Sequence, residues 1–187
     1  FDSQTGKPIF EEKRINFDIE YIEQPVSARI PNHLEIVRSS VGIPIAADEA
    51  LGSLADAKRI VSQDAADILI IKAARLGGIS KSMEIIDFAR ESSKDVVITS
   101  SLESDIGIAA SAHLVSSLPH NTLAQGLSTS LLFNDNLGTD LLIPVSGQMY
   151  PPHGSGLGVD VDLSRLEKYG LPIVGNVGEL PSGWEKA

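Results

Sequence analysis

Three charged residues stand at comparable points of three successive apolar segments, and their types could hold a metal ion and handle a proton. Glu23 closes one segment, Asp48 lies near the end of the next, and Lys72 follows the apolar run of a third. A charged side chain beside an apolar strand is costly unless it is paired or liganded. Because Mg²⁺ prefers oxygen ligands, this set predicts a hard cation with a lysine beside it. The alternative is that these charges face solvent at the strand ends or form a structural ion pair.

The segments that must position these residues alternate between strand and helix patterns. The apolar runs are nearly continuous rather than alternating, which is typical of parallel strands buried on both faces. Such alternation favours an α/β fold. The strands are expected at 18–25, 43–50, 67–78, 95–104 and 122–129, and the helices at 31–42, 53–66, 80–92 and 105–118.

The spacing of the candidate residues fits a barrel. Glu23 and Asp48 are 25 residues apart, and Asp48 and Lys72 are 24 apart. A (β/α)₈ barrel uses about 25–31 residues per unit and carries its active site at the carboxyl ends of the strands. Five strands cannot close an eight-stranded barrel, so only part of one is expected. A doubly wound open sheet is the rival fold, but its GxGxxG phosphate signature is missing.

The composition narrows the class of protein. The 187 residues carry a net charge of −10 and no cysteine. The acidic balance argues against nucleic acid or an anionic membrane as a partner, and no thiolate metal site can form. We expect an irregular lead-in over 1–17, a partial barrel domain over 18–170 and a tail over 171–187. A cytoplasmic location is expected, or a plastid if the source is a photosynthetic eukaryote.

Five motifs in order resemble those of the enolase superfamily, in its muconate-cycloisomerase-like subgroup. The resemblance covers roughly residues 19–163 and implies the C-terminal part of a (β/α)7β barrel, with the capping domain and early strands missing. The motifs are YIEQP (21–25), AADEA (46–50), IKAARLGG (71–78), ITSSLESDIG (98–107) and AQGLST (124–129).

This resemblance implies roles for the charged residues. Glu23 and Asp48 match the positions that bind Mg²⁺ in the family, Glu49 would be a neighbour of the metal site, and Lys72 would project into the active site. Removing a proton alpha to a carboxylate requires the developing negative charge to be neutralised by a metal and nearby cations. The resemblance therefore implies an enzyme with a Mg²⁺ cofactor and a small carboxylate as its substrate.

Within the family, the stretches at 100–104, 107–114 and 126–137 are most similar to o-succinylbenzoate synthases. Those carbon–oxygen lyases dehydrate 2-succinyl-6-hydroxy-2,4-cyclohexadiene-1-carboxylate to o-succinylbenzoate in menaquinone or phylloquinone synthesis. The alternative within the superfamily is an N-acylamino acid racemase or dipeptide epimerase, since Lys72 suits either chemistry.

Further residues are candidates for binding the substrate carboxylates. Ser100 and Ser101 offer hydroxyl groups, and the turn at Gly77 and Gly78 offers backbone N–H groups. Each could equally be an ordinary turn or cap residue. Glu103 is expected beside the site rather than in contact with the metal.

The sequence departs from the family pattern in its first part. It contains no K-x-K motif, which carries the catalytic base in the family, and no counterpart of the first metal carboxylate. We therefore expect the chain to be a portion of a longer enzyme, and this portion to be inactive alone. A homo-oligomer is among the expected assemblies. A short protein with a binding role on a partial barrel is the other possibility, although it would expose sheet edges.

Overall fold

The computed structural model describes residues 18–169, except residue 31 and the stretches 120–122 and 140–141. The expected lead-in over 1–17 and the expected tail over 171–187 lie outside the described residues. No helix in the described part of the chain is long and apolar enough to cross a membrane.

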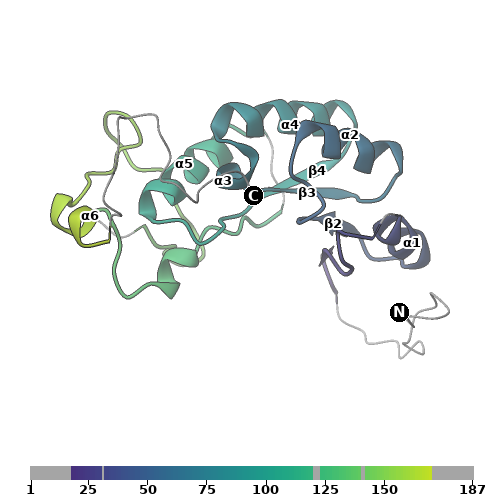
Figure 1. The fold of residues 1–187 in the computed structure, drawn as a ribbon, viewed down its shortest axis with the longest axis horizontal. Helices are drawn as coiled ribbons and strands as arrows, with labels where there is room; N and C mark the ends of the chain where they lie inside the picture. Colours follow the sequence, from purple (N-terminus) through teal and green to yellow (C-terminus); the bar gives the residue numbers. More distant parts are fainter. Residues whose placement is uncertain (1–17, 31, 120–122, 140–141, 170–187) are drawn as a thin grey trace, which may run out of the picture.

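The centre of the fold is a four-stranded parallel sheet (Figure 1). The strands lie in the order in which they occur in the chain, and each pairs with the next in parallel. Parallel pairing and the strand–helix alternation confirm the α/β fold class. The strands are β1 (Ile22–Glu23), β2 (Ile45–Ala47), β3 (Ile68–Ile71) and β4 (Asp95–Ile98).

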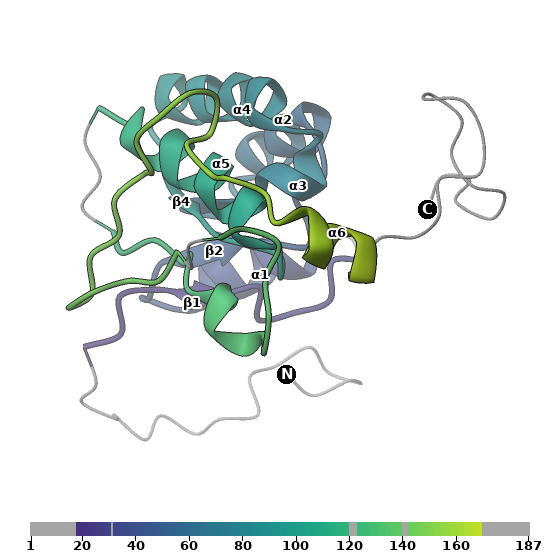
Figure 2. The same ribbon diagram turned by 90° about the vertical axis from the view of Figure 1, so that its left-hand side faces the viewer.

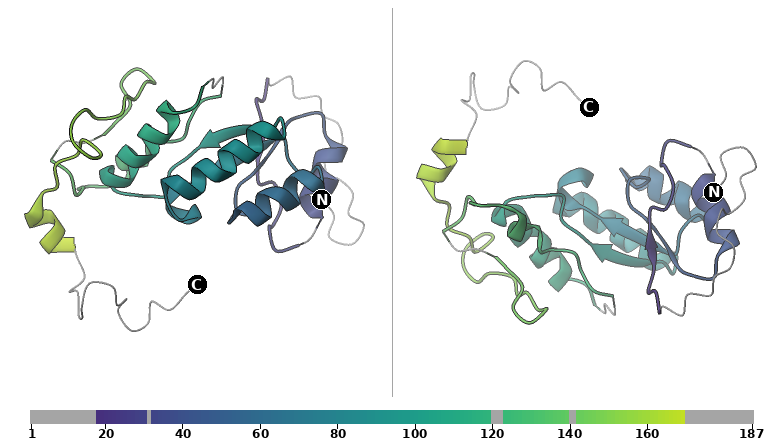
Figure 3. Two further views of the ribbon diagram at one scale, coloured as in Figure 1. Left: turned by 90° about the horizontal axis from the view of Figure 1, so that it is seen from above. Right: turned by 90° about the horizontal axis from the view of Figure 1, so that it is seen from below.

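Three of the longer helices, α2, α4 and α5, pack on one side of the sheet. Figures 2 and 3 show α2, α4 and α5 as a layer above the strands. The helices are α1 (His33–Ser40), α2 (Leu54–Ser62), α3 (Ala73–Leu76), α4 (Ile79–Glu91), α5 (Asp105–Ser116) and α6 (Leu163–Tyr169), with a 3₁₀ turn, η1, over Thr129–Leu132.

The apolar runs are continuous because both faces of the strands are buried. In β3, Leu69 and Ile71 belong to the large core cluster between sheet and helices. Ile68 and Ile70 point to the other face, where a smaller cluster includes Val97. All four β3 residues are at most 3% exposed. Burial of each such side chain is worth about 1.5–3 kcal/mol.

The fifth expected strand, 122–129, is shorter than predicted. In its described part only Gly126 forms a strand-type pair, with Thr99. One residue earlier, the side-chain oxygen of Gln125 accepts the N–H of Ile98 at 2.7 Å. A side chain thus replaces the backbone carbonyl that would have extended the ladder.

The third expected strand, 67–78, is strand only in its first half. It ends at Ile71, and the carbonyl of Lys72 then accepts the N–H groups of Arg75 (2.9 Å) and Leu76 (3.0 Å). These bonds form the short helix α3, which ends at Gly77 with φ 89°. Glycine adopts this left-handed conformation without the steric cost of a side chain.

An ion-pair network ties elements together at the amino ends of the strands. Arg38 of α1 donates to Asp67 at 2.8 and 2.9 Å and also pairs with Asp64. The other oxygen of Asp67 accepts the N–H of Ile45 at 2.9 Å, and Lys94 binds Asp64 at 3.0 Å. Burial alone would raise the pKa of Asp67, but the hydrogen bonds from Arg38 and Ile45 lower it overall.

Candidate metal and substrate site

The two candidate metal carboxylates follow neighbouring strands. Glu23 is the last residue of β1 and pairs in register with Ala46, and Asp48 directly follows the last residue of β2. The side-chain oxygen of Gln24 accepts the N–H groups of Asp48 (3.0 Å) and Ala50 (3.2 Å). This side chain therefore joins the carboxyl ends of β1 and β2 directly beside both carboxylates.

The carboxylate of Asp48 is only 4% exposed and is compensated by two positive charges. The ammonium group of Lys72 donates to Oδ2, and Arg75 Nη1 lies 3.2 Å from Oδ1. A buried carboxylate is stable only when it is paired or liganded. The structure thus brings the predicted residues Asp48 and Lys72 into direct contact.

Glu23 lies close enough to Asp48 for the charge of Asp48 to affect its pKa. Partial burial, and then the charge of Asp48 and a hydrogen bond between the two carboxyl groups, raise the pKa of Glu23 above its usual value. Lys72 opposes this rise, and the charge of Glu49 adds to it. A divalent cation beside Glu23 would favour the ionised form of this carboxyl group, because an opposite charge nearby lowers a carboxyl pKa.

The oxygen donors of Glu23 and Asp48 fit a hard cation such as Mg²⁺, which prefers carboxylate and water oxygens. Glu49 is exposed and lies next in the chain to Asp48. In the part of the chain that the structure describes, no three acidic or histidine side chains come together as a complete ligand set. Glu23 and Asp48 therefore stay two predicted members of such a set.

Arg75 belongs to this site and was not predicted from the sequence. The stretch around it, IKAARLGG (71–78), was predicted to continue the strand. In a strand, Arg75 and Lys72 would point to opposite faces. Helix α3 instead turns the chain so that both side chains reach Asp48. The signal that could have revealed it is the Gly77–Gly78 pair, which marks a helix end soon after Lys72.

The hydroxyl of Ser100 is used within the fold. It lies 3.0 Å from the carbonyl of Gly126 and accepts a hydrogen bond from Thr129 at 2.8 Å. The N–H of Ser100 also donates to Gly126 O at 2.9 Å. Ser100 is buried and fastens the end of β4 to the start of η1, so its predicted contact with substrate stays a prediction.

Ser101 and Glu103 contact each other at the same strand end. The N–H of Ser101 donates to Oε2 of Glu103. Among the described residues, neither Ser101 Oγ nor Glu103 Oε1 has a hydrogen-bond partner, although both atoms are buried. Gly107 makes room for Glu103, because a Cβ there would lie 2.5 Å from Glu103 Cβ. The predicted contact of Ser101 with substrate and the predicted position of Glu103 beside the site stay predictions.

Gly77 and Gly78 form the turn between α3 and α4. Both backbone N–H groups donate to the carbonyl of Ala73, the one of Gly78 at 2.8 Å. Both glycines have positive φ, 89° and 101°. Their N–H groups therefore shape the turn that follows Lys72, and their predicted role as carboxylate donors stays a prediction.

Asp105 is a buried acid that joins α5 to the segment after η1. It is 0% exposed, and its carboxylate accepts the N–H of Gly138 at 2.8 and 3.0 Å. The N–H of Asp105 donates in turn to the side-chain oxygen of Asn136 at 2.9 Å. Asn136 thus caps α5 from a distant part of the chain, in place of the adjacent Ser104, whose side chain makes no cap bond.

The sheet, the position of the charges at its carboxyl ends and the order of the motifs define a member of the enolase superfamily. The family described as "Enolase C-terminal domain-like" matches residues 10–165. The chain therefore belongs to this family.

Curated relatives carry two enzyme names. The chain is 36% identical over 131 residues to o-succinylbenzoate synthase of Thermobifida fusca, covering 70% of this chain and 40% of the relative. It is 30% identical over 151 residues to muconate cycloisomerase 1 of Rhodococcus opacus, covering 81% of this chain and 40% of the relative. The chain thus spans about two fifths of the length of these relatives.

Solved structures agree with this placement. The muconate lactonizing enzyme from Pseudomonas putida matches with a TM-score of 0.76 and 28% identity, over 81% of this chain and 42% of that one. The N-succinyl Arg/Lys racemase from Bacillus cereus matches with a TM-score of 0.74 and 26% identity, over 81% of this chain and 40% of that one. The match confirms the expected C-terminal barrel portion.

Proposed function

We propose that the chain supplies the carboxyl-terminal part of the active site of a Mg²⁺-dependent o-succinylbenzoate synthase. The reaction removes a proton alpha to a carboxylate and then expels water. The observation that carries the proposal is the convergence of Glu23, Asp48 and Lys72 at the carboxyl ends of three neighbouring strands. The names of the relatives support the choice of substrate.

In this proposal Glu23 and Asp48 hold the cation, which when bound neutralises charge that develops on the substrate carboxylate. Lys72 places a second positive charge beside Asp48, where it stabilises the enediolate form of the substrate. Arg75 orients the carboxylate of Asp48 through its contact with Oδ1. The base that takes the proton is assigned to another lysine, because Lys72 already donates to Asp48.

The test is an assay of the protein as encoded with 2-succinyl-6-hydroxy-2,4-cyclohexadiene-1-carboxylate and Mg²⁺, following the formation of o-succinylbenzoate. We expect turnover that stops with a chelator and returns with Mg²⁺. The 187-residue chain on its own is expected to give none. A protein that binds Mg²⁺ but never forms o-succinylbenzoate would contradict the proposal.

A racemase of N-acylated amino acids is the second candidate, favoured by the similarity to N-succinyl Arg/Lys racemase. Racemisation requires loss and return of the alpha proton without loss of water. Incorporation of solvent deuterium at the alpha carbon of N-succinyl-arginine would reveal it. Exchange on that substrate, with no dehydration of the cyclohexadiene, would select this candidate over the synthase.

A further inference from the structure

Leu102 occupies an unfavourable position in the turn between β4 and α5. Its φ is 65°, in the left-handed region, and it is 60% exposed. A bulky residue other than glycine is uncommon in that region and raises the energy of the backbone. An exposed leucine also gains little from burial. Neither backbone preference nor packing accounts for a leucine here.

The turn is held in this conformation from both sides. Before Leu102, Ser100 is fastened to Gly126 and Thr129. After it, Asn136 caps the first N–H of α5, and Asp105 holds Gly138. A strained conformation persists only where the surrounding structure over-determines it, and such positions cluster at ligand contacts.

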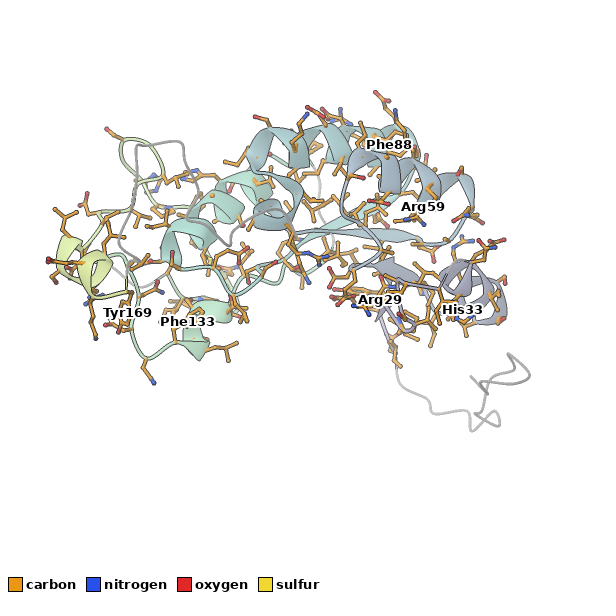
Figure 4. The ribbon with its side chains drawn as sticks, in the orientation of Figure 1. Arg29, His33, Arg59, Phe88, Phe133 and Tyr169 are labelled. Carbon is orange, nitrogen blue, oxygen red and sulfur yellow. The ribbon has the colours of Figure 1, made fainter. Side chains whose placement is uncertain are left out.

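The surroundings of Leu102 suit a small ligand with a hydrocarbon part. Leu102 lines a cavity of about 370 Å³ together with Phe133, Leu137 and Tyr169, and the rest of its lining is polar: Ser104, Asn134, Asp135 and Asn136. Figure 4 shows Phe133 and Tyr169 at the same end of the molecule. Ligand pockets of about 300–1,000 Å³ are usually apolar with a few polar groups.

The polar groups of this turn flank Leu102 directly. Ser101 Oγ and Glu103 Oε1 are buried, and no hydrogen-bond partner for either atom is present in the described part of the chain. These two side chains therefore turn into the protein on either side of Leu102, whose own side chain is the one that lines the cavity.

We propose that Leu102 is a specificity-determining residue that contacts the ring or aliphatic part of a carboxylate ligand. The inference rests on the proposed function, because it places this ligand at the carboxyl ends of the strands. It adds the reason for a leucine in a strained turn: the backbone is fixed so that one apolar side chain faces the ligand.

Two replacements at position 102 test whether the side chain contacts the ligand. Leu102→Gly removes both the strain and the side chain, whereas Leu102→Met keeps an apolar side chain of similar size. Ser93→Gly is the matched control, because Ser93 has φ 55° and lies at the opposite end of β4. The probe is o-succinylbenzoate, with its Kd measured by calorimetry on the protein as encoded in saturating Mg²⁺, together with the melting temperature.

We expect Leu102→Gly to weaken o-succinylbenzoate binding at least tenfold without lowering the melting temperature. Leu102→Met and Ser93→Gly should stay within threefold of the wild-type Kd. A purely structural Leu102 predicts the reverse: an unchanged Kd in Leu102→Gly, which would overturn the proposal. Loss of binding that accompanies a lowered melting temperature, with no recovery in Leu102→Met, would also overturn it.

The two proposals fail separately. If the wild-type protein binds o-succinylbenzoate but does not form it, the proposed synthase reaction falls, and the ratio of Kd values still decides the role of Leu102. If the wild type turns over and Leu102→Gly keeps the wild-type Kd, the inference about Leu102 falls alone. A wild type that does not bind the probe would overturn the inference directly.

Discussion

The ammonium group of Lys72 donates a hydrogen bond to the carboxylate of Asp48, across the ends of two neighbouring strands. Arg75 contacts the other oxygen of the same carboxylate at 3.2 Å. One buried carboxylate therefore pairs with two positively charged side chains, and both come from the junction between β3 and α3. In the proposed function, this acid also faces the cation, so its replacement should affect binding and catalysis together.

Asp48→Asn keeps the shape of the side chain and removes its negative charge. We expect Mg²⁺ affinity to fall at least tenfold and synthase turnover to be lost. Calorimetric titration with Mg²⁺ and the turnover assay measure the two effects. Asp87→Asn, an exposed acid on α4, is the control and should change neither. Wild-type kcat for Asp48→Asn at ordinary Mg²⁺ concentrations would show that Asp48 is not a ligand.

Lys72→Met retains most of the side chain's volume and removes its charge. Turnover should fall by about 10²–10³-fold, the cost of losing one preorganised donor in an active site. The fold should persist, because Arg75 still compensates Asp48. Circular dichroism checks the fold, and Lys81→Met on the exposed face of α4 serves as the control. A fully active Lys72→Met variant would exclude the assigned site.

The raised pKa of Glu23 predicts a pH dependence of stability. A raised pKa means that the folded state holds the proton more tightly than the unfolded state, so this contribution to stability is present at low pH. It is lost as pH rises from the unfolded value of about 4.3 through the raised pKa. Urea titrations without divalent cations should therefore show that the free energy of unfolding decreases as pH rises through this range. The Glu23→Gln variant should not show this decrease.

Mg²⁺ should counter this decrease, because it binds the ionised carboxylates. Its stabilising effect is expected to grow over the pH range in which Glu23 loses its proton. An effect of Mg²⁺ that is the same at low and high pH would argue against Glu23 as a ligand.

The Arg38 network should contribute to stability and not to the site. Arg38→Met leaves Asp67 without its two charged hydrogen bonds, and we expect a loss of about 1–2 kcal/mol in the free energy of unfolding. Chemical denaturation measures it. Arg90→Met, which removes an exposed pair within α4, should change stability by less than about 0.5 kcal/mol. If the two replacements lowered the free energy of unfolding equally, Arg38 would contribute no more to stability than an exposed ion pair.

Gly138→Ala tests the junction between α5 and the segment after η1. A Cβ at position 138 would lie 2.1 Å from Oδ2 of Asp105. We expect a loss of about 2 kcal/mol or more, since either the carboxylate or the backbone must move. Gly42→Ala is the control, because a Cβ there meets nothing within 4 Å. Thermal unfolding compares the two, and a neutral Gly138→Ala would mean that the segment adapts freely.

Local sequence patterns were enough to predict the parallel sheet and the proximity of Asp48 and Lys72. The continuous apolar run of β3 predicted burial on both faces, and the structure confirms it. The side chain of Ser53 accepts the N–H of Asp56 and so caps α2, a role typical of serine at the start of a helix. The regular spacing of Asp48 and Lys72 likewise placed them together, because parallel strands end at one edge of the sheet.

The missed features depend on contacts between distant residues or on a change of secondary structure. Asp105 had the pattern of an ordinary acid in the first turn of a helix, yet it is buried because Gly138, 33 residues later, lies over it. Arg75 was missed because the chain changes from strand to helix at Lys72. A periodicity argument assumes one conformation across the segment, and here the conformation changes within it.

The hydrogen bond from Ile98 to the side chain of Gln125 has a further consequence for variation in this chain. Pairing between strand backbones tolerates most side chains, because each residue offers the same N–H and carbonyl. At position 125 the partner is a side chain, so a substitution can leave the N–H of Ile98 unpaired. The pairing at this edge of the sheet therefore depends on which amino acid stands at position 125, and this position should accept few replacements.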